Sequence, residues 1–497
     1  MTACTSTYGD MSQTKKDWIA SLTEVLPLTP IDRTAPVGYF SLVYGFPGGP
    51  WPYAKRRRSI AHIAIRLKAV IAKFPFLGGQ LLLDDGQPER SKVMYSPDPR
   101  AANITQLGKS DIHPIHCIQD EMISFKTDLF DSEVTMAEIL RNGAPPSAIK
   151  PDFLHPSATA THYKNGHYLH PLTLRTSILK DGLILGFSVH HSAMDLAGFT
   201  PILASFADLG TAPPFDLAAH LTTCPPPPLH HPRLLPRTPA HLAPLHTFCL
   251  HRTRARLGAD AFVSRVDVLS ALVWVVLTCA RARAWPANAD GKPTLSPTAP
   301  TRFCTAVNLR ERMGIAGVYT GNCFMRVLTA PDVTVERLLG GLEEPRWEQV
   351  ANAAGWIRAA IEDLDRDWPG HVKLARIAAG LENGGGPEVA RRSDVGQAVA
   401  RATARDGAGV DCSVNVTMGG PDVMFDIPGL AGADAEGKVR PAFVRFPFDR
   451  VGGCVRILPR VGGAKGTEDW EVLIPVREEE STFLVTEFER LVSNPFL

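Results

Sequence analysis

An apolar run at residues 183–189 ends in a group of polar residues. The run is rich in β-forming side chains, which predicts a buried strand. Two adjacent histidines, His190 and His191, follow it, and Asp195 comes four residues after the second. Apolar residues then recur at helical spacing over 196–209, which predicts a helix. The polar residues are therefore expected where a buried strand gives way to a helix.

The same periodicities mark further elements along the chain. Extended structure is expected where apolar residues run together and glycine or proline interrupts the helical spacing. Long stretches with apolar residues at helical spacing predict helices. The helix at 267–282 is expected to be buried because it is almost entirely apolar. The predicted strands are 37–46 and 81–83, and the predicted helices are 58–74, 267–282, 335–364 and 388–405.

The middle of the chain is rich in proline. Residues 213–244 include a run of four consecutive prolines, which predicts an extended and semi-rigid linker. A chain of 497 residues is also too long for one ordinary core, so two domains are expected. We predict an N-terminal domain at 1–211, a crossover linker at 212–248 and a C-terminal domain at 249–497. The alternation of strands and helices indicates the α/β class.

Charge and composition exclude several classes of function. The 52 basic and 51 acidic residues nearly balance, which argues against a nucleic-acid or anionic-membrane partner. The longest apolar run, 268–280, is shorter than the roughly 20 residues that span a membrane. The first fifteen residues lack the apolar core of a secretory signal, and the nine cysteines show no metal spacing. We expect a soluble cytoplasmic protein without a metal.

The His-x-x-x-Asp pattern suggests acid–base chemistry. A neutral imidazole takes and returns a proton near pH 7, so His191 is a candidate general base. Asp195 either holds that ring by a hydrogen bond or points away and braces the loop through a distant arginine. Both histidines are also compatible with polar loop residues that follow a buried strand. No G-x-S-x-G elbow and no G-x-G-x-x-G after a strand is present, which disfavours a serine nucleophile and a nicotinamide cofactor.

The segment HHSAMD at 190–195 resembles the HHxxxD motif of BAHD-type acyl-CoA-dependent acyltransferases, in particular the fungal branch similar to trichothecene acetyltransferases. Other family patterns follow in the family's order, although D-I-P-G-L replaces the family's D-F-G-W-G. The matching stretches are L-P-L-T-P-I-D at 26–32, F-P-F-L-G-G at 74–79, D-V-L-S-A-L-V-W at 267–274, N-L-R-E-R at 308–312, Y-T-G-N at 319–322 and D-I-P-G-L at 426–430.

The resemblance implies a fold of two chloramphenicol-acetyltransferase-like domains, each a mixed sheet with flanking helices, with the active-site tunnel between them. It implies that His191 deprotonates a hydroxyl or amine of a small secondary metabolite, which attacks the thioester of the co-substrate acyl-CoA. Asp195 is then structural and keeps His191 oriented through an ion pair, for which Arg310 is a candidate. A monomer without a metal is expected.

The resemblance also implies further site residues. Thr417 or a backbone N–H is expected to stabilise the oxyanion, and His190 is expected to serve mainly as a packing residue. The substrate-binding candidates are His190, Gly198, Thr417, Asp426 and Gly429. The cofactor-binding candidates are Ser270, Arg310 and Lys438.

Two alternatives remain open. The first is a condensation or cyclisation catalyst that uses a carrier-bound or intramolecular acyl group, for which the basic cluster 55–58 is the only candidate docking face. The second is a non-catalytic binding protein of the same fold. The intact HHSAMD counts against this second alternative, and the altered D-I-P-G-L segment counts slightly for it.

Overall fold

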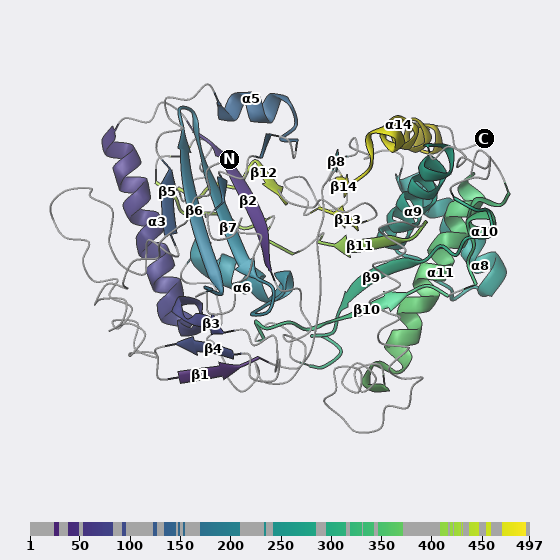
Figure 1. Ribbon diagram of the computed structural model, residues 1–497, viewed down its shortest axis with the longest axis horizontal. Coiled ribbons are helices and arrows are strands. Elements are labelled where there is room, and N and C mark those ends of the chain that lie inside the picture. The colour runs from purple at the N-terminus through teal and green to yellow at the C-terminus, as the bar shows by residue number, and fades with distance from the viewer. Residues whose placement is uncertain are drawn as a thin grey trace, which may run out of the picture.

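The chain is described here from a computed structural model, in which two groups of elements lie side by side (Figure 1). The residues that the structure describes are 24–28, 38–48, 53–82, 92–95, 123–126, 134–145, 148–149, 153–154, 169–208, 233–234, 242–284, 295–314, 319–330, 332–341, 346–370, 408–415, 418–420, 422–428, 430, 437–446, 454–458 and 470–493.

A five-stranded sheet organises the first group, in the order β12-β2-β7-β6-β5. Every residue of the central strand β7 is buried, as the apolar run predicted, and it pairs antiparallel with β2 and β6. Strand β7 ends at the first histidine of the motif. The strands are β2 (Tyr39–Pro47), β5 (Ile123–Lys126), β6 (Leu172–Leu179), β7 (Gly182–His190) and β12 (Phe443–Arg445).

Helices cover both faces of this sheet. The helices α3 (Tyr53–Lys73) and α6 (Leu196–Ala207) pack on the face to which Leu42 and Tyr44 of β2 point. The short helix α5 (Met136–Arg141) packs on the opposite face, with Val43. A small antiparallel sheet of β1 (Glu24–Pro27), β4 (Lys92–Tyr95) and β3 (Gln80–Leu82) lies beside α3, after the 3-10 turn η1 (Pro75–Gly78).

A six-stranded sheet organises the second group, in the order β10-β9-β11-β13-β14-β8. It is mixed, because β11 pairs parallel with β9 and β13 whereas the outer pairs are antiparallel. The strands are β8 (Arg233–Leu234), β9 (Phe303–Asn308), β10 (Phe324–Leu328), β11 (Val410–Val414), β13 (Cys454–Ile457) and β14 (Val472–Ile474).

The helix predicted at 267–282 is the centre of the second group. It forms α9 (Arg265–Ala284), which is buried from Asp267 to Arg281 and packs against one face of the six-stranded sheet. The surrounding helices complete the core on that face, and none of the described helices covers the other face. The surrounding helices are α8 (Leu242–Leu257), α10 (Val335–Leu339), α11 (Trp347–Arg366) and α14 (Glu478–Ser493).

The alternation of side chains along β11 shows which residues lie on each face of the six-stranded sheet. Val410 and Cys412 pack into the core with α9, whereas Asp411 and Ser413 lie on the opposite, uncovered face. In β13 the same alternation places Val455 in the core and its neighbours toward the uncovered face. Side chains in a strand point alternately to the two faces, so one face is apolar and the other polar.

Some predictions need correction. The single helix expected over 335–364 is wrong: two helices, α10 and α11, form instead, because Gly340 ends α10 in the left-handed region at φ +69°. Residues 388–405 lie outside the described residues. Strand β12 comes from the C-terminal half yet pairs with β2 of the first sheet. The boundaries at 211 and 249 stay predictions, since most of 209–241 also lies outside the described residues.

Within the described part of the chain, no helix is long and apolar enough to cross a membrane. The same residues include no group of three or more histidine, cysteine, aspartate or glutamate side chains placed to hold a metal ion.

Candidate functional site

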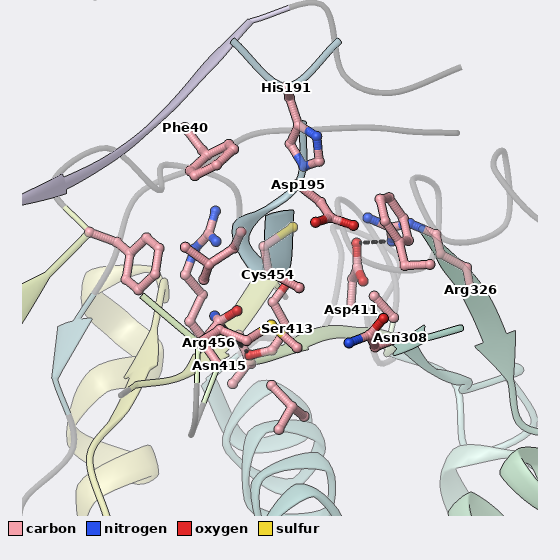
Figure 2. Close-up of a pocket in the computed structure, with 18 of the residues that line it drawn as sticks. Phe40, His191, Asp195, Asn308, Arg326, Asp411, Ser413, Asn415, Cys454 and Arg456 are labelled. Carbon is pink, nitrogen blue, oxygen red and sulfur yellow. Dashed lines mark hydrogen bonds and ion pairs between the residues drawn. The ribbon is translucent and has the colours of Figure 1, made fainter. Parts of the chain in front are cut away.

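A cavity of about 200 Å³ lies where the end of β7 meets the uncovered face of the six-stranded sheet. His191, Phe40 and the start of α6 line it from the first group of elements. Residues of β9, β10, β11 and β13 line it from the second group, and Figure 2 shows them below His191. The cavity therefore lies between the two groups of elements, and the HHSAMD motif forms part of its wall.

Asn322 holds the His191 side chain and main chain together. The Asn322 amide nitrogen donates to the His191 carbonyl oxygen at 2.8 Å, and its Oδ1 lies 3.1 Å from Nδ1 of the His191 ring. A carbonyl oxygen can only accept, so the amide N–H₂ must face it and Oδ1 must face the ring. Nδ1 therefore carries the ring proton, and Nε2 keeps its lone pair. In this tautomer Nε2 is the atom that can accept a proton.

The surroundings of His191 favour its neutral form. Burial lowers the pKa of His191 to about 4, and Asp195 and the Asn322 hydrogen bond oppose this shift only in part. The rings of Phe40 and Phe324 lie at centroid distances of 5.2 and 6.0 Å from the imidazole. At neutral pH the ring is therefore an unprotonated base in an aromatic setting.

Asp195 turns away from the imidazole and forms a buried ion pair with Arg310. Its two oxygens accept from the Arg310 guanidinium at 2.7 and 3.1 Å. The same oxygens accept the backbone N–H of Gly198 at 2.7 Å, which caps α6, and that of Cys323 at 2.8 Å. The interpretation of Asp195 as a brace through a distant arginine is the one that this geometry supports.

The ion pair fixes the segment that carries Asn322. Arg310 donates from Nε to the Tyr319 carbonyl at 3.0 Å and from Nη2 to the Gly321 carbonyl. Together with the Cys323 N–H on Asp195, these bonds hold the chain on both sides of Asn322. Asp195 therefore acts on His191 indirectly, by positioning the residue that sets its tautomer.

Gly198 is required by a close approach of the backbone. A Cβ atom at this position would lie 1.8 Å from the carbonyl oxygen of Thr320, in the segment that Arg310 holds. Gly198 does not itself line the cavity. Of the two approaches that its small size permits, substrate or neighbouring backbone, the structure shows the backbone.

His190 is buried against Tyr39 and does not line the cavity. Its side chain is fully buried, its ring lies edge-on to Tyr39 at 5.0 Å, and burial lowers its pKa to about 3. Its Nδ1 accepts the Ser192 N–H at 3.3 Å. This position matches the packing role expected for it and gives no support to substrate binding.

The remaining predicted site residues divide into three groups. Asp426 forms an ion pair with Arg66, and Lys438 forms one with Asp208 at 2.9 Å, both away from the cavity lining. Ser270 is buried in α9 and bonds to the thiol of Cys412 on the core face. Arg310 does line the cavity, although its guanidinium is engaged by Asp195. Thr417 and Gly429 lie outside the described residues.

Several residues in or beside the cavity were not predicted as site residues from the sequence. Asp411 of β11 and Arg326 of β10 form an ion pair at 2.5 Å on the uncovered face, and Arg456 of β13 lies beside them (Figure 2). Asn322 stood in the Y-T-G-N resemblance but had no assigned role. The alternation of polar residues in short strands was the only signal for the others.

Comparison with solved structures gives close matches over nearly the whole chain. TRI101 of F. sporotrichioides, in complex with coenzyme A and T-2, matches with a TM-score of 0.69 at 20% identity, over 93% of this chain and 97% of that one. Vinorine synthase matches with a TM-score of 0.57 at 15% identity, over 94% of each chain. This chain has the BAHD acyltransferase fold. The predicted fold class is thereby confirmed.

Sequence comparison adds one curated relative. The O-acetyltransferase dmxR13 of Cryptosporiopsis sp. (strain 8999) is 23% identical over 336 residues. The match spans 60% of this chain and 65% of the relative, so this BAHD-fold chain covers just under two thirds of that protein's length. No family model matches the chain.

Proposed function

We propose that the protein is an acyl-CoA-dependent O-acyltransferase in which His191 is the general base. One observation carries the proposal: in the cavity between the two groups of elements, Asn322 fixes the His191 tautomer that leaves Nε2 as proton acceptor. The O-acetyltransferase relative and the coenzyme A complex of a structural neighbour support the choice of donor and reaction.

The reaction would proceed in a ternary complex of protein, acyl-CoA and a small-molecule alcohol of the secondary-metabolite type. Nε2 of His191 takes the hydroxyl proton while the oxygen attacks the thioester carbonyl. The tetrahedral intermediate then expels the thiolate, which receives the same proton from Nε2. General-base assistance of this kind contributes about 10² to 10⁴ in rate, and holding both substrates in one cavity supplies the entropic part.

The other residues of the site hold groups in place and exchange no proton. Asp195 never exchanges a proton in this scheme, because Arg310 and two backbone N–H groups engage both of its oxygens. An N–H donor or the Thr417 hydroxyl remains our proposal for the oxyanion. For the donor, the cavity gives no support to contacts from Ser270 or Lys438.

The proposal is tested by release of free CoA from acetyl-CoA in the presence of hydroxylated natural products. We expect turnover by the wild type, loss of at least about 10²-fold in His191→Ala, and wild-type rates in the matched control His62→Ala. Thermal unfolding of each variant separates loss of chemistry from loss of fold.

Equal turnover by wild type and His191→Ala would refute the role of this base. Turnover only with a carrier-bound acyl group, or on a lone polyketide, would favour the condensation or cyclisation alternative. Saturable ligand binding without any turnover would favour the non-catalytic one. The predictions of a monomer and of a cytoplasmic location stay predictions, and size-exclusion chromatography tests the first.

A further inference from the structure

The six-stranded sheet presents neutral hydrogen-bonding side chains to the cavity. Asn308 is the last residue of β9, Ser413 lies in β11, and Asn415 directly follows that strand. All three line the cavity, and Figure 2 shows them below His191. Uncharged groups of this kind fix the orientation of a ligand by hydrogen bonds to its neutral oxygen functions.

Arg310 determines which way the Asn308 amide faces. One terminal atom of the amide lies 3.1 Å from the backbone nitrogen of Arg310 and 3.2 Å from its Nη1. Both nitrogens only donate, so the atom between them is Oδ1. The N–H₂ group of Asn308 therefore faces away from Arg310, and it donates to none of the described residues. Because Asn308 is half-buried and lines the cavity, this N–H₂ is available to a ligand there.

The fixed orientation of this amide restricts what it can bind. Its N–H₂ group only donates and its Oδ1 is engaged by Arg310, so the ligand must supply an acceptor atom. A carbonyl oxygen meets this requirement with two lone pairs and no hydrogen of its own. A ligand without that oxygen would leave the donor unpaired in a closed cavity, which disfavours its binding.

The surroundings of the base are apolar. The rings of Phe40 and Phe324 flank the His191 imidazole at 5.2 and 6.0 Å, and Met418 also lines the cavity. Aromatic and aliphatic walls favour a flat apolar ligand body. The cavity thus offers a proton acceptor at Nε2 of His191, apolar walls beside it, and a hydrogen-bond donor at Asn308.

We propose that Asn308 is a specificity-determining residue, whose N–H₂ group binds a carbonyl oxygen of the acceptor alcohol while the acceptor's hydroxyl lies at Nε2 of His191. The acceptor is then a flat hydroxy-carbonyl compound, such as a hydroxylated aromatic ketone. This inference rests on the proposed function, since it selects among the acceptors of that reaction.

Two acceptors of the same bicyclic shape test the subsite, each with acetyl-CoA as donor. The compound 5-hydroxy-1-tetralone carries a ketone, and 5,6,7,8-tetrahydro-1-naphthol lacks it. From the release of free CoA we expect the wild type to favour the ketone by about fivefold or more in kcat/KM, as one neutral hydrogen bond provides.

Asn308→Asp is the decisive variant, because it keeps an oxygen for Arg310 and replaces the N–H₂ group by a second oxygen. It should bring the ratio of the two kcat/KM values to one or below. The matched control Asn352→Asp lies on α11, outside the cavity lining, and should keep the wild-type ratio. If thermal unfolding shows that Asn308→Asp does not fold, Asn308→Ala replaces it and should bring the ratio to about one.

Three results would overturn the subsite. The first is a wild-type ratio near or below one, and the second is a ratio that the Asn308 variant leaves unchanged. The third is an equal loss on both acceptors in that variant, which would assign the Asn308 N–H₂ group to the thioester oxygen instead.

Calorimetric binding of the two compounds decides if neither acceptor leads to release of CoA. Tighter binding of the ketone by the wild type, with the difference lost in the Asn308 variant, supports the subsite while the acyl transfer fails. Equal binding of both compounds by the wild type, or no binding of either, overturns the subsite as well.

Discussion

The Asp195–Arg310 ion pair gives the sharpest test of how the fold supports the site. Asp195→Asn is the smallest perturbation, since it keeps the shape and removes the charge. Each carboxylate oxygen now accepts two N–H donors: Gly198 and Arg310 on one side, Cys323 and Arg310 on the other. Whichever way the asparagine amide turns, its N–H₂ group faces two other donors, and it can form a hydrogen bond with neither because all three groups only donate.

The structure sets the expected cost. Both side chains are less than 10% exposed, so Asp195→Asn leaves a buried guanidinium without its counter-charge. Breaking a buried pair from one side costs about 3–5 kcal/mol. Arg310→Met should cost a similar amount, because it leaves the carboxylate buried. The double variant removes both charges, so it should cost less than the sum of the singles by about 2–3 kcal/mol.

The measurement is urea unfolding followed by tryptophan fluorescence for the two single variants and the double variant. Asp365→Asn is the control, because its pair with Arg312 is partly solvent-exposed, at 41% and 25% of the two side chains, and should cost less than about 1 kcal/mol. The kcat of Asp195→Asn should also fall as Asn322 loses its position. Additive costs to within about 0.5 kcal/mol would refute the reasoning, since the two side chains would then not be coupled.

Three further predictions concern packing and pH. Gly198→Ala should destabilise the protein by about 1–3 kcal/mol in the same urea assay, because its Cβ meets the Thr320 carbonyl; Gly355→Ala, in the open middle of α11, should instead stabilise it by about 1 kcal/mol. The acidic limb of kcat/KM should fall near pH 4 rather than near pH 6.5, because burial lowers the pKa of His191 and only the neutral ring is a base; a limb near pH 6.5 would show that the ring is not buried as described. His190 has a depressed pKa of about 3, so the unfolded chain binds the extra proton below pH 6.5, and this group alone should lower stability by about 1.4 kcal/mol per unit as pH drops from about 6 to 4. His191, with its pKa lowered to about 4, should add a similar contribution over most of that range; a pH-independent urea midpoint from about pH 6 to 4 would contradict this.

The sequence by itself determined the main buried elements and the position of His191 next to one of them. The strand β7 and the helix α9 could be predicted because a buried element has an almost unbroken run of apolar residues, and such a run is visible locally in the sequence. The same local pattern predicted that the HHSAMD segment follows a buried strand, and His191 in that segment lines the cavity. The ion pair between Asp195 and Arg310 was predicted as one of two possibilities, and the structure contains it.

Only the tertiary structure decided what surrounds His191. Asn322 lies 131 residues from His191, and no local pattern shows that its amide meets the imidazole. Strand order likewise brings Asp411 and Arg456 to one face, because β11 and β13 pair across a long intervening segment. Short strands carry few residues, so their alternation does not tell which face looks onto a cavity. The place of His191 after a buried strand was local information, whereas its tautomer, its pKa and the charges around it came from contacts between distant segments.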